Sequence, residues 1–152
     1  MIHYPHKGFA LLISVVLAAV ALSIGLALLD IALKQVILAS AAKQSQKAFY
    51  AADSVMECAL YYDQQLNAFD RTNNISAITC NTLPVTNYLS PAPSGSDPRV
   101  TTFTVPCAGS GEQGSVTVYK NSDASTQIYA LGYNTCDTNN TRRIERGLKV
   151  TY

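Results

Sequence analysis

The chain has 152 residues, with 11 basic and 10 acidic side chains, which gives a formal net charge of +1 at pH 7. A charge so close to zero provides no basic surface of the kind that binding to nucleic acid requires, so we expect no nucleic-acid partner. A membrane-length apolar segment occupies the N-terminal part. The remainder is long enough for about one small domain.

The most distinctive stretch begins at Lys7-Gly8-Phe9 and continues as an uncharged apolar run to Leu29. At ~1.5 Å rise per residue, about twenty apolar residues in a helix span the core of a bilayer. A buried core helix rarely reaches this length without a charge. A cleaved secretory signal has a shorter apolar core of about 7–15 residues, although a cut after Ala39-Ser40-Ala41 fits the signal-peptide pattern. A single-pass anchor fits the hydropathy as well.

The four cysteines all lie beyond this run, at Cys58, Cys80, Cys107 and Cys136. An even number in a small exported domain indicates two disulfide bonds, for which three pairings are possible. The alternative is four free thiols in a reducing compartment. Lys7 before the apolar run favours a cytoplasmic N-terminus and an outside C-terminal domain, in agreement with disulfide formation. Among the three pairings we prefer Cys58 with Cys80 and Cys107 with Cys136.

From Phe9 to about Asn67 there is no proline, and only Gly25 departs from good helix formers. One helix of this length would extend about 85–90 Å. Asp30 and Lys34 stand four residues apart and can pair on one face. An apolar stripe recurs at three- and four-residue steps and should face a core: Phe49, Ala52, Val55, Met56, Ala59 and Leu60. The charged residues of this half should mostly point away from the stripe: Lys43, Lys47, Asp53, Glu57 and Asp63.

The sequence contains no convincing catalytic group. Both histidines, His3 and His6, precede Gly8, so a chain cut after Gly8 would have no histidine. That excludes Ser-His-Asp and Cys-His nucleophile systems and histidine-bearing metal sites. Asp53 and Glu57 could act as a general acid and base only beside a cleft, whereas such a pair more often lies on an exposed helix face. We therefore expect no enzyme, no catalytic residue, no cofactor and no metal.

The C-terminal part changes character twice. Residues 68–99 are rich in Asn, Thr, Ser and Pro, which predicts a connecting loop. From Val100 the apolar period becomes two, which predicts an antiparallel sheet of four strands: Val100–Val105, Ser115–Lys120, Gln127–Tyr133 and Arg143–Tyr152. In the last strand Ile144, Leu148 and Val150 share a face that should pack on the helix stripe. The predicted fold class is therefore α+β.

Two short patterns lie in the loops of this part. The segment Asp137–Thr141 carries several oxygen-bearing side chains but lacks the acidic spacing and closing glutamate of an EF-hand, and Asn and Asp are common turn formers. Asn74-Ile75-Ser76 and Asn139-Asn140-Thr141 match the acceptor pattern for N-glycosylation, which also arises often by chance.

The junction Lys7-Gly8-Phe9 directly before the apolar run resembles the class III signal of type IV pilins and pseudopilins. The stretch Ala48–Asp63, in which an Ala-Ala-acidic turn leads into the apolar stripe, is similar to the helix of PilX-type minor pilins. The resemblance covers the N-terminal helix and not the globular part. It implies that a prepilin peptidase cuts between Gly8 and Phe9 and methylates the new terminus at Phe9.

The resemblance implies a pilin-like organisation, with a long membrane-spanning helical stalk packed on a small four-stranded sheet. The segments are a leader (1–8), a transmembrane and filament-core helix (9–38), an amphipathic helix half (39–67), an αβ-loop (68–99) and an antiparallel β-domain (100–152). The implied partners are other pilin subunits, the prepilin peptidase, the inner-membrane assembly platform, and membrane lipid before assembly. The expected location is the cytoplasmic membrane in a single pass, and a cell-surface filament after assembly.

Two departures from the family bear on the role. Major type IV pilins have glutamate as the fifth mature residue, which neutralises the N-terminal amine of a neighbouring subunit, and here that position is Ile13. The family's mid-helix proline is replaced by Asp30. Both departures favour a minor, tip or priming subunit of a type IV pilus or type II secretion-like filament. The alternative is a signal-anchored exported binding domain that does not assemble.

Overall fold

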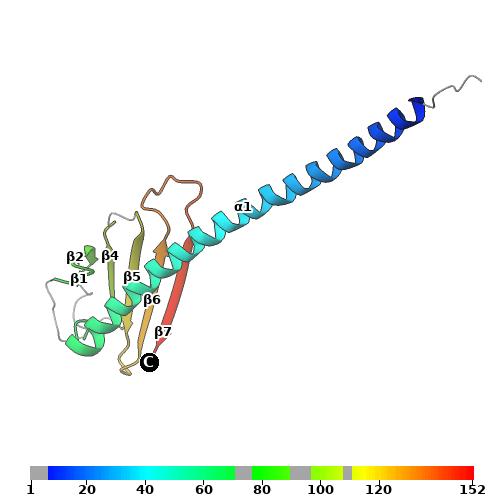
Figure 1. Ribbon diagram of the computed structural model, residues 1–152. Coiled ribbons are helices and arrows are strands. Elements are labelled where there is room, and N and C mark those ends of the chain that lie inside the picture. Colours follow the sequence, from blue (N-terminus) through cyan, green and yellow to red (C-terminus); the bar gives the residue numbers. More distant parts are fainter. Residues whose placement is uncertain (1–6, 71–76, 90–96, 108–110) are drawn as a thin grey trace, which may run out of the picture. The chain divides into compact units, whose positions relative to one another are not determined.

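The computed structural model describes residues 7–70, 77–89, 97–107 and 111–152. It consists of a long helix, α1 (Lys7–Leu66), and an antiparallel β-structure (Figure 1). The strands are β1 (Thr79–Cys80), β2 (Leu83–Pro84), β3 (Thr86–Leu89), β4 (Arg99–Val105), β5 (Gln113–Lys120), β6 (Thr126–Tyr133) and β7 (Glu145–Thr151). The chain divides into two compact units, Met1–Ala41 and Ala42–Tyr152, which are described in turn.

The predicted single helix is confirmed, and its end has a clear local cause. Asn67 adopts a left-handed backbone with φ of 47°. This turn brings the Asn67 N–H to the carbonyl of Asp63 (3.1 Å) and the Ala68 N–H to the carbonyl of Tyr62 (2.9 Å). Asparagine tolerates this conformation, and the two bonds satisfy carbonyls that the last helical turn leaves without partners.

The main sheet has five strands in the order β3-β4-β5-β6-β7, every neighbouring pair antiparallel. The four expected strands are present as β4 to β7, although β7 begins at Glu145 and not at Arg143. The segment predicted as a connecting loop also contains β3, which pairs with β4, and the separate β1–β2 hairpin. These strands have two to four residues, too few for an alternating pattern to indicate them.

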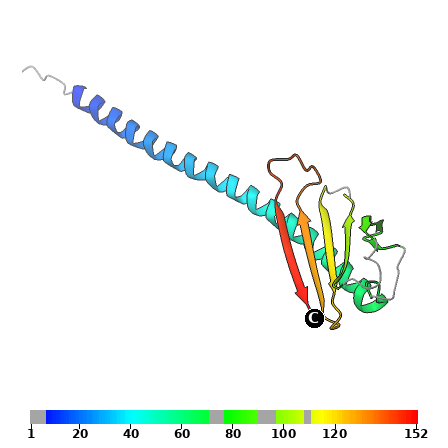
Figure 2. The same ribbon diagram turned by 180° about the vertical axis from the view of Figure 1, so that it is seen from behind.

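The core of the second unit lies between one face of the sheet and residues 42–66 of α1 (Figures 1 and 2). Burial alternates along β4, β5 and β6, so that every second side chain faces the helix. The inward side chains Phe103, Val116, Val118 and Ile128 are at most 1% exposed. Each such side chain stabilises the fold by roughly 1.5–3 kcal/mol through its burial. Leu148 and Val150 of β7 also pack against this core, as expected.

The helix stripe is confirmed at four of its six predicted positions, which are buried: Ala52, Val55, Met56 and Ala59. Leu60 is partly buried, and Phe49 was wrongly assigned, because it is 43% exposed while Ala48 is fully buried. The reason is a close approach of the two backbones. A Cβ atom placed on Gly132 of β6 would lie 2.1 Å from the Ala48 carbonyl oxygen. No large side chain fits into a contact this close.

Candidate functional site

The first candidate feature is the apolar half of α1. From Phe9 to Ala41 every side chain is exposed in this unit, including the large apolar ones. The helix is long and apolar enough to cross a membrane, and none of its most apolar window is buried. A core helix of a soluble protein passes the same length test but is mostly buried, so the exposure separates the two cases. One helix near the N-terminus of this chain could therefore span a membrane.

Four polar side chains of this segment form bonds within the helix. The Ser14 hydroxyl donates to the Leu11 carbonyl, and the Ser23 hydroxyl donates to the Val20 carbonyl, both at 2.8 Å. Lys34 and Asp30 form the expected ion pair, with 2.7 Å between Nζ and Oδ2. Hydroxyls bonded to their own helix are compatible with lipid, where no water can satisfy them.

The predicted processing residues lie at the start of the same helix. Gly8 and Phe9 are in the first turn of α1, and the Phe9 side chain is 69% exposed. Ile13, the fifth residue after the predicted cut, is 41% exposed. Residues 1–6 of the expected leader lie outside the described residues. Cleavage at Gly8–Phe9 stays a prediction.

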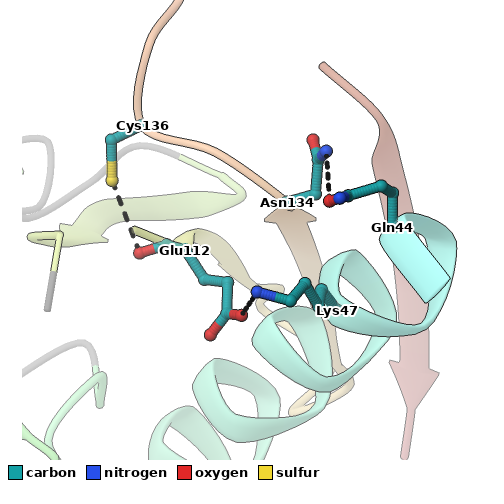
Figure 3. Close-up of polar contacts among 5 residues, drawn as sticks. All are labelled: Gln44, Lys47, Glu112, Asn134 and Cys136. Atoms are coloured by element: carbon teal, nitrogen blue, oxygen red, sulfur yellow. Dashed lines mark hydrogen bonds and ion pairs between the residues drawn. The ribbon is translucent and has the colours of Figure 1, made fainter. Parts of the chain in front are cut away.

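The second candidate feature is the set of polar contacts that tie α1 to the sheet at residues 44–47 (Figure 3). The Asn134 amide donates both to Gln44 Oε1 (3.0 Å) and to the Arg142 carbonyl (3.1 Å), and its oxygen accepts from the Ile144 N–H (2.6 Å). One asparagine thus joins the helix to both ends of the β6–β7 loop. Lys47 Nζ lies 3.2 Å from Glu112 Oε1, also in Figure 3.

Both disulfide bonds are present in the pairing that we preferred. Cys58 of the helix is bonded to Cys80 of β1, and Cys107 after β4 is bonded to Cys136 of the β6–β7 loop. The first bond joins the segment after α1 back to the helix. The second joins the loop that precedes β7 to the end of β4. No free cysteine occurs among the described residues.

A polar cluster around the buried Asp63 lies near the C-terminal end of α1, and sequence reasoning missed it. Asp63, which we placed away from the stripe, is only 3% exposed. Its Oδ2 atom accepts from Lys120 Nζ (2.8 Å) and from the Tyr152 hydroxyl (2.6 Å). Burial raises the pKa of the Tyr152 phenol, and the hydrogen bond to Asp63 raises it further. The cluster links α1 to β5 and to the end of β7.

Asp53 and Glu57 lie apart from the open pocket beside Tyr50, Ser54 and Asn81. Asp53 is half-buried and Glu57 is exposed, and the acidic residue that lines this pocket is Glu112. Within the described ranges no group of three or more metal-ligating side chains comes together. In the segment Asp137–Thr141, the Asp137 carboxylate accepts the Asn139 N–H at 2.9 Å, as in an ordinary turn.

We compared the chain with known proteins by sequence and by fold. No protein-family model matches it, and neither does any curated protein or solved structure.

Proposed function

We propose that this protein is a pilin-like minor subunit, with a tip or priming role, of a type IV pilus or type II secretion-like filament. After processing at Gly8–Phe9, its helix would be held in the membrane and then pack among the helices of other subunits. The partners would be those subunits, the prepilin peptidase and the assembly platform. The observation that carries the proposal is the length of the exposed apolar helix.

Apolar side chains remain exposed from Phe9 to Leu38. Thirty helical residues extend about 45 Å, whereas the core of a bilayer is about 30 Å thick. Tilt alone would need roughly 48°, which exceeds the 0–40° that membrane helices show. An anchor that ends at the Asp30–Lys34 pair leaves exposed apolar side chains beyond the membrane, among them Ile31, Val36, Ile37 and Leu38. Neighbouring helices in a filament would cover them.

The minor role rests on position 13. A charged N-terminal amine that is buried among apolar helices without a partner costs several kcal/mol. Glutamate at this position supplies the partner in major pilins, and Ile13 offers no charge. A subunit of this kind would stack poorly beneath another copy. It suits the end of a filament, where no subunit lies above it.

The alternative function is a signal-anchored exported domain. The observation that favours it is the uncharged run from Phe9 to Leu29, which by itself has the length of a membrane span and is followed by the exposed Asp30–Lys34 pair. In that case Asp30 and Lys34 would lie at the outer membrane surface, where charged groups are tolerated.

The N-terminal mass of the mature chain tests the proposal. We would extract the protein from membranes and, separately, from sheared filaments of the native host. A chain that begins at N-methylated Phe9 and occurs in both fractions is the expected result. A chain that begins at Met1 would indicate the signal anchor, and one that begins after Ala41 a secreted domain. Either would contradict the proposal.

A further inference from the structure

The loop between β6 and β7 (residues 134–144) extends past the ends of both strands (Figures 1 and 2). It is shaped by two successive turns. The Asn140 N–H donates to the Asp137 carbonyl (3.3 Å), and the Arg143 N–H donates to the Asn140 carbonyl (3.0 Å). Asn139 and Thr141 lie within these turns, and both are exposed.

The three asparagines of this loop differ in what their side chains do. Asn134 makes three hydrogen bonds, to the helix and to both sides of the loop base. The Asn140 side chain accepts the Arg142 N–H at 2.9 Å. The Asn139 amide has no hydrogen-bond partner in the described part of the chain, and neither has the Thr141 hydroxyl. The shape of the loop therefore depends on Asn134, Asp137 and Asn140, and not on the side chain of Asn139.

This difference bears on the acceptor pattern Asn139-Asn140-Thr141. The ordinary explanation for asparagine in a loop is that its side chain forms the turn. That explanation accounts for Asn140 and fails for Asn139. Both groups that define the pattern, the amide and the hydroxyl two residues later, lie in an exposed turn and have no hydrogen-bond partner in the ranges that the structure describes. The disulfide Cys107–Cys136, which holds this loop through Cys136, is typical of exported domains, where N-glycosylation takes place.

We infer that Asn139 is an acceptor for an N-linked glycan. The co-reactant is a glycosyl donor of the lipid-linked sugar diphosphate class, used by a host glycosyltransferase. The Asn139 Nδ2 atom forms a bond to the anomeric carbon, and the bond between that carbon and the donor's diphosphate oxygen breaks. The diphosphate leaves with the electron pair, and the amide loses one proton to a base of the transferase. No oxidation or reduction occurs.

Glycosylation of Asn139 requires that the second unit is exported, but it does not require assembly into a filament. A signal-anchored protein would be modified in the same way, so this inference and the proposed function can fail independently. The glycan would extend into solvent from the exposed loop and would displace no core side chain, because the Asn139 side chain is exposed and has no hydrogen-bond partner among the described residues.

The test is the mass of one tryptic peptide from the full-length protein, isolated from membranes of its native host and then reduced. Cleavage at Lys120 and Arg142 releases residues 121–142, which contain Asn139, whereas the other acceptor pattern falls in residues 72–99. We expect added glycan mass on the peptide 121–142, with fragmentation assigning it to Asn139. An unmodified peptide in the native protein would overturn the inference.

Four variants refine the test. Asn139→Gln and Thr141→Ala should each lose the added mass completely, the second while leaving the asparagine itself in place. Asn140→Gln and Thr141→Ser preserve the acceptor pattern and should keep the mass. Retention of the glycan in Asn139→Gln would overturn the assignment to this residue. Loss in all four variants would also contradict it, because the result would then reflect the loop and not the acceptor.

Discussion

Two glycines determine how closely α1 approaches the sheet. A Cβ atom on Gly132 would lie 2.1 Å from the Ala48 oxygen and 2.2 Å from the Ala52 nitrogen, both of which are backbone atoms. On Gly114 it would meet the Val55 side chain at 2.3 Å. Backbone atoms of a packed helix cannot move aside as a side-chain end can. The two positions are therefore not equivalent, and Gly132 is the more restrictive.

Gly132→Ala should lower the free energy of unfolding of the second unit by about 3 kcal/mol or more, the upper end of the overpacking range, because helix and strand must separate. Urea denaturation of the detergent-solubilised chain, with its disulfides intact, measures this. Gly147→Ala is the matched control, since its nearest contact is the flexible end of Leu131 at 3.2 Å. Equal effects of the two substitutions would show that the close approach is not the cause.

The hydrogen bond between Tyr152 and Asp63 predicts a dependence of stability on pH. The folded-state pKa of this phenol is raised above its usual value of about 10, so the folded state favours the neutral form. Its contribution is complete below pH 10 and is lost as the pH rises through the folded-state pKa. Tyr152→Phe should cost about 1.5–3 kcal/mol near pH 7, the range for a hydrogen bond to a charged group. The free energy of unfolding of this variant should also fall less above pH 10 than that of the native chain.

Urea denaturation at several pH values from 7 to 11 measures both effects. Tyr133→Phe provides a comparison, because burial, followed by Glu145, also raises the pKa of that phenol while it lies on the other face of the sheet. An unchanged alkaline loss of stability in Tyr152→Phe would rule out this explanation.

Asp63 also shows what the sequence could predict at the residue scale. It stands four residues after Ala59, in register with the stripe, and only its charge led us to place it outside. A charged residue in register with a stripe is a usable signal for a buried polar cluster, but its partners Lys120 and Tyr152 are 57 and 89 residues away. Phe49 is in register too. Its exposure follows from the Gly132 contact, which local periodicity cannot indicate.

At the scale of elements, prediction succeeded where a pattern repeats several times. The absence of proline and the choice of helix formers indicated α1, and alternation over seven or eight residues indicated β4, β5 and β6. The strands β1 to β3 are too short for this and depend on tertiary contacts. The hairpin β1–β2 turns at Asn81 and Thr82, which both have left-handed backbones. A threonine in that conformation is not a turn signal that sequence reasoning would use.

The apolar helix is longer than a membrane span, so a charge placed beyond Leu29 should affect membrane insertion and incorporation into filaments differently. Val36→Asp places a charge in the segment beyond Leu29, where Val36 is 67% exposed. Membrane insertion should persist, because the run from Phe9 to Leu29 is unchanged. Incorporation into filaments should fall at least tenfold, since an unpaired carboxylate among packed helices costs more than the ~1.4 kcal/mol that a tenfold change requires.

The measurement compares the amount of protein in membranes with the amount in sheared filaments. Val36→Leu is the control, because it keeps the site apolar. Normal incorporation of Val36→Asp would show that this segment does not pack against other helices. Loss of the protein from membranes as well would show that the segment belongs to the membrane span, so that the argument from excess length would fail.

At the scale of the whole molecule, the two units would have different roles in two successive states, first in the membrane and then in a filament. The described part of the first unit exposes every side chain from Phe9 to Ala41, whereas the second unit has a buried core and two disulfide bonds. A unit that exposes so much apolar surface requires lipid or other helices around it. The second unit needs neither, so the transfer from membrane to filament could proceed without unfolding it.

If the protein is a filament subunit as proposed, the residue at position 13 would determine where in the filament it lies. Ile13→Glu would give the chain the carboxylate that, by resemblance to the major pilins, pairs with the amine of a neighbouring subunit. The variant should then occur along the shaft and not only at one end, as labelled antibody and electron microscopy can show. Ile13→Gln is the matched control. Glutamine is polar and has the same shape as glutamate but carries no charge, so this variant should keep the end position.

If Ile13→Glu keeps the end position too, the missing charge does not determine placement. If the native chain is already distributed along the shaft, the tip or priming role is wrong, although membership of the filament would stand.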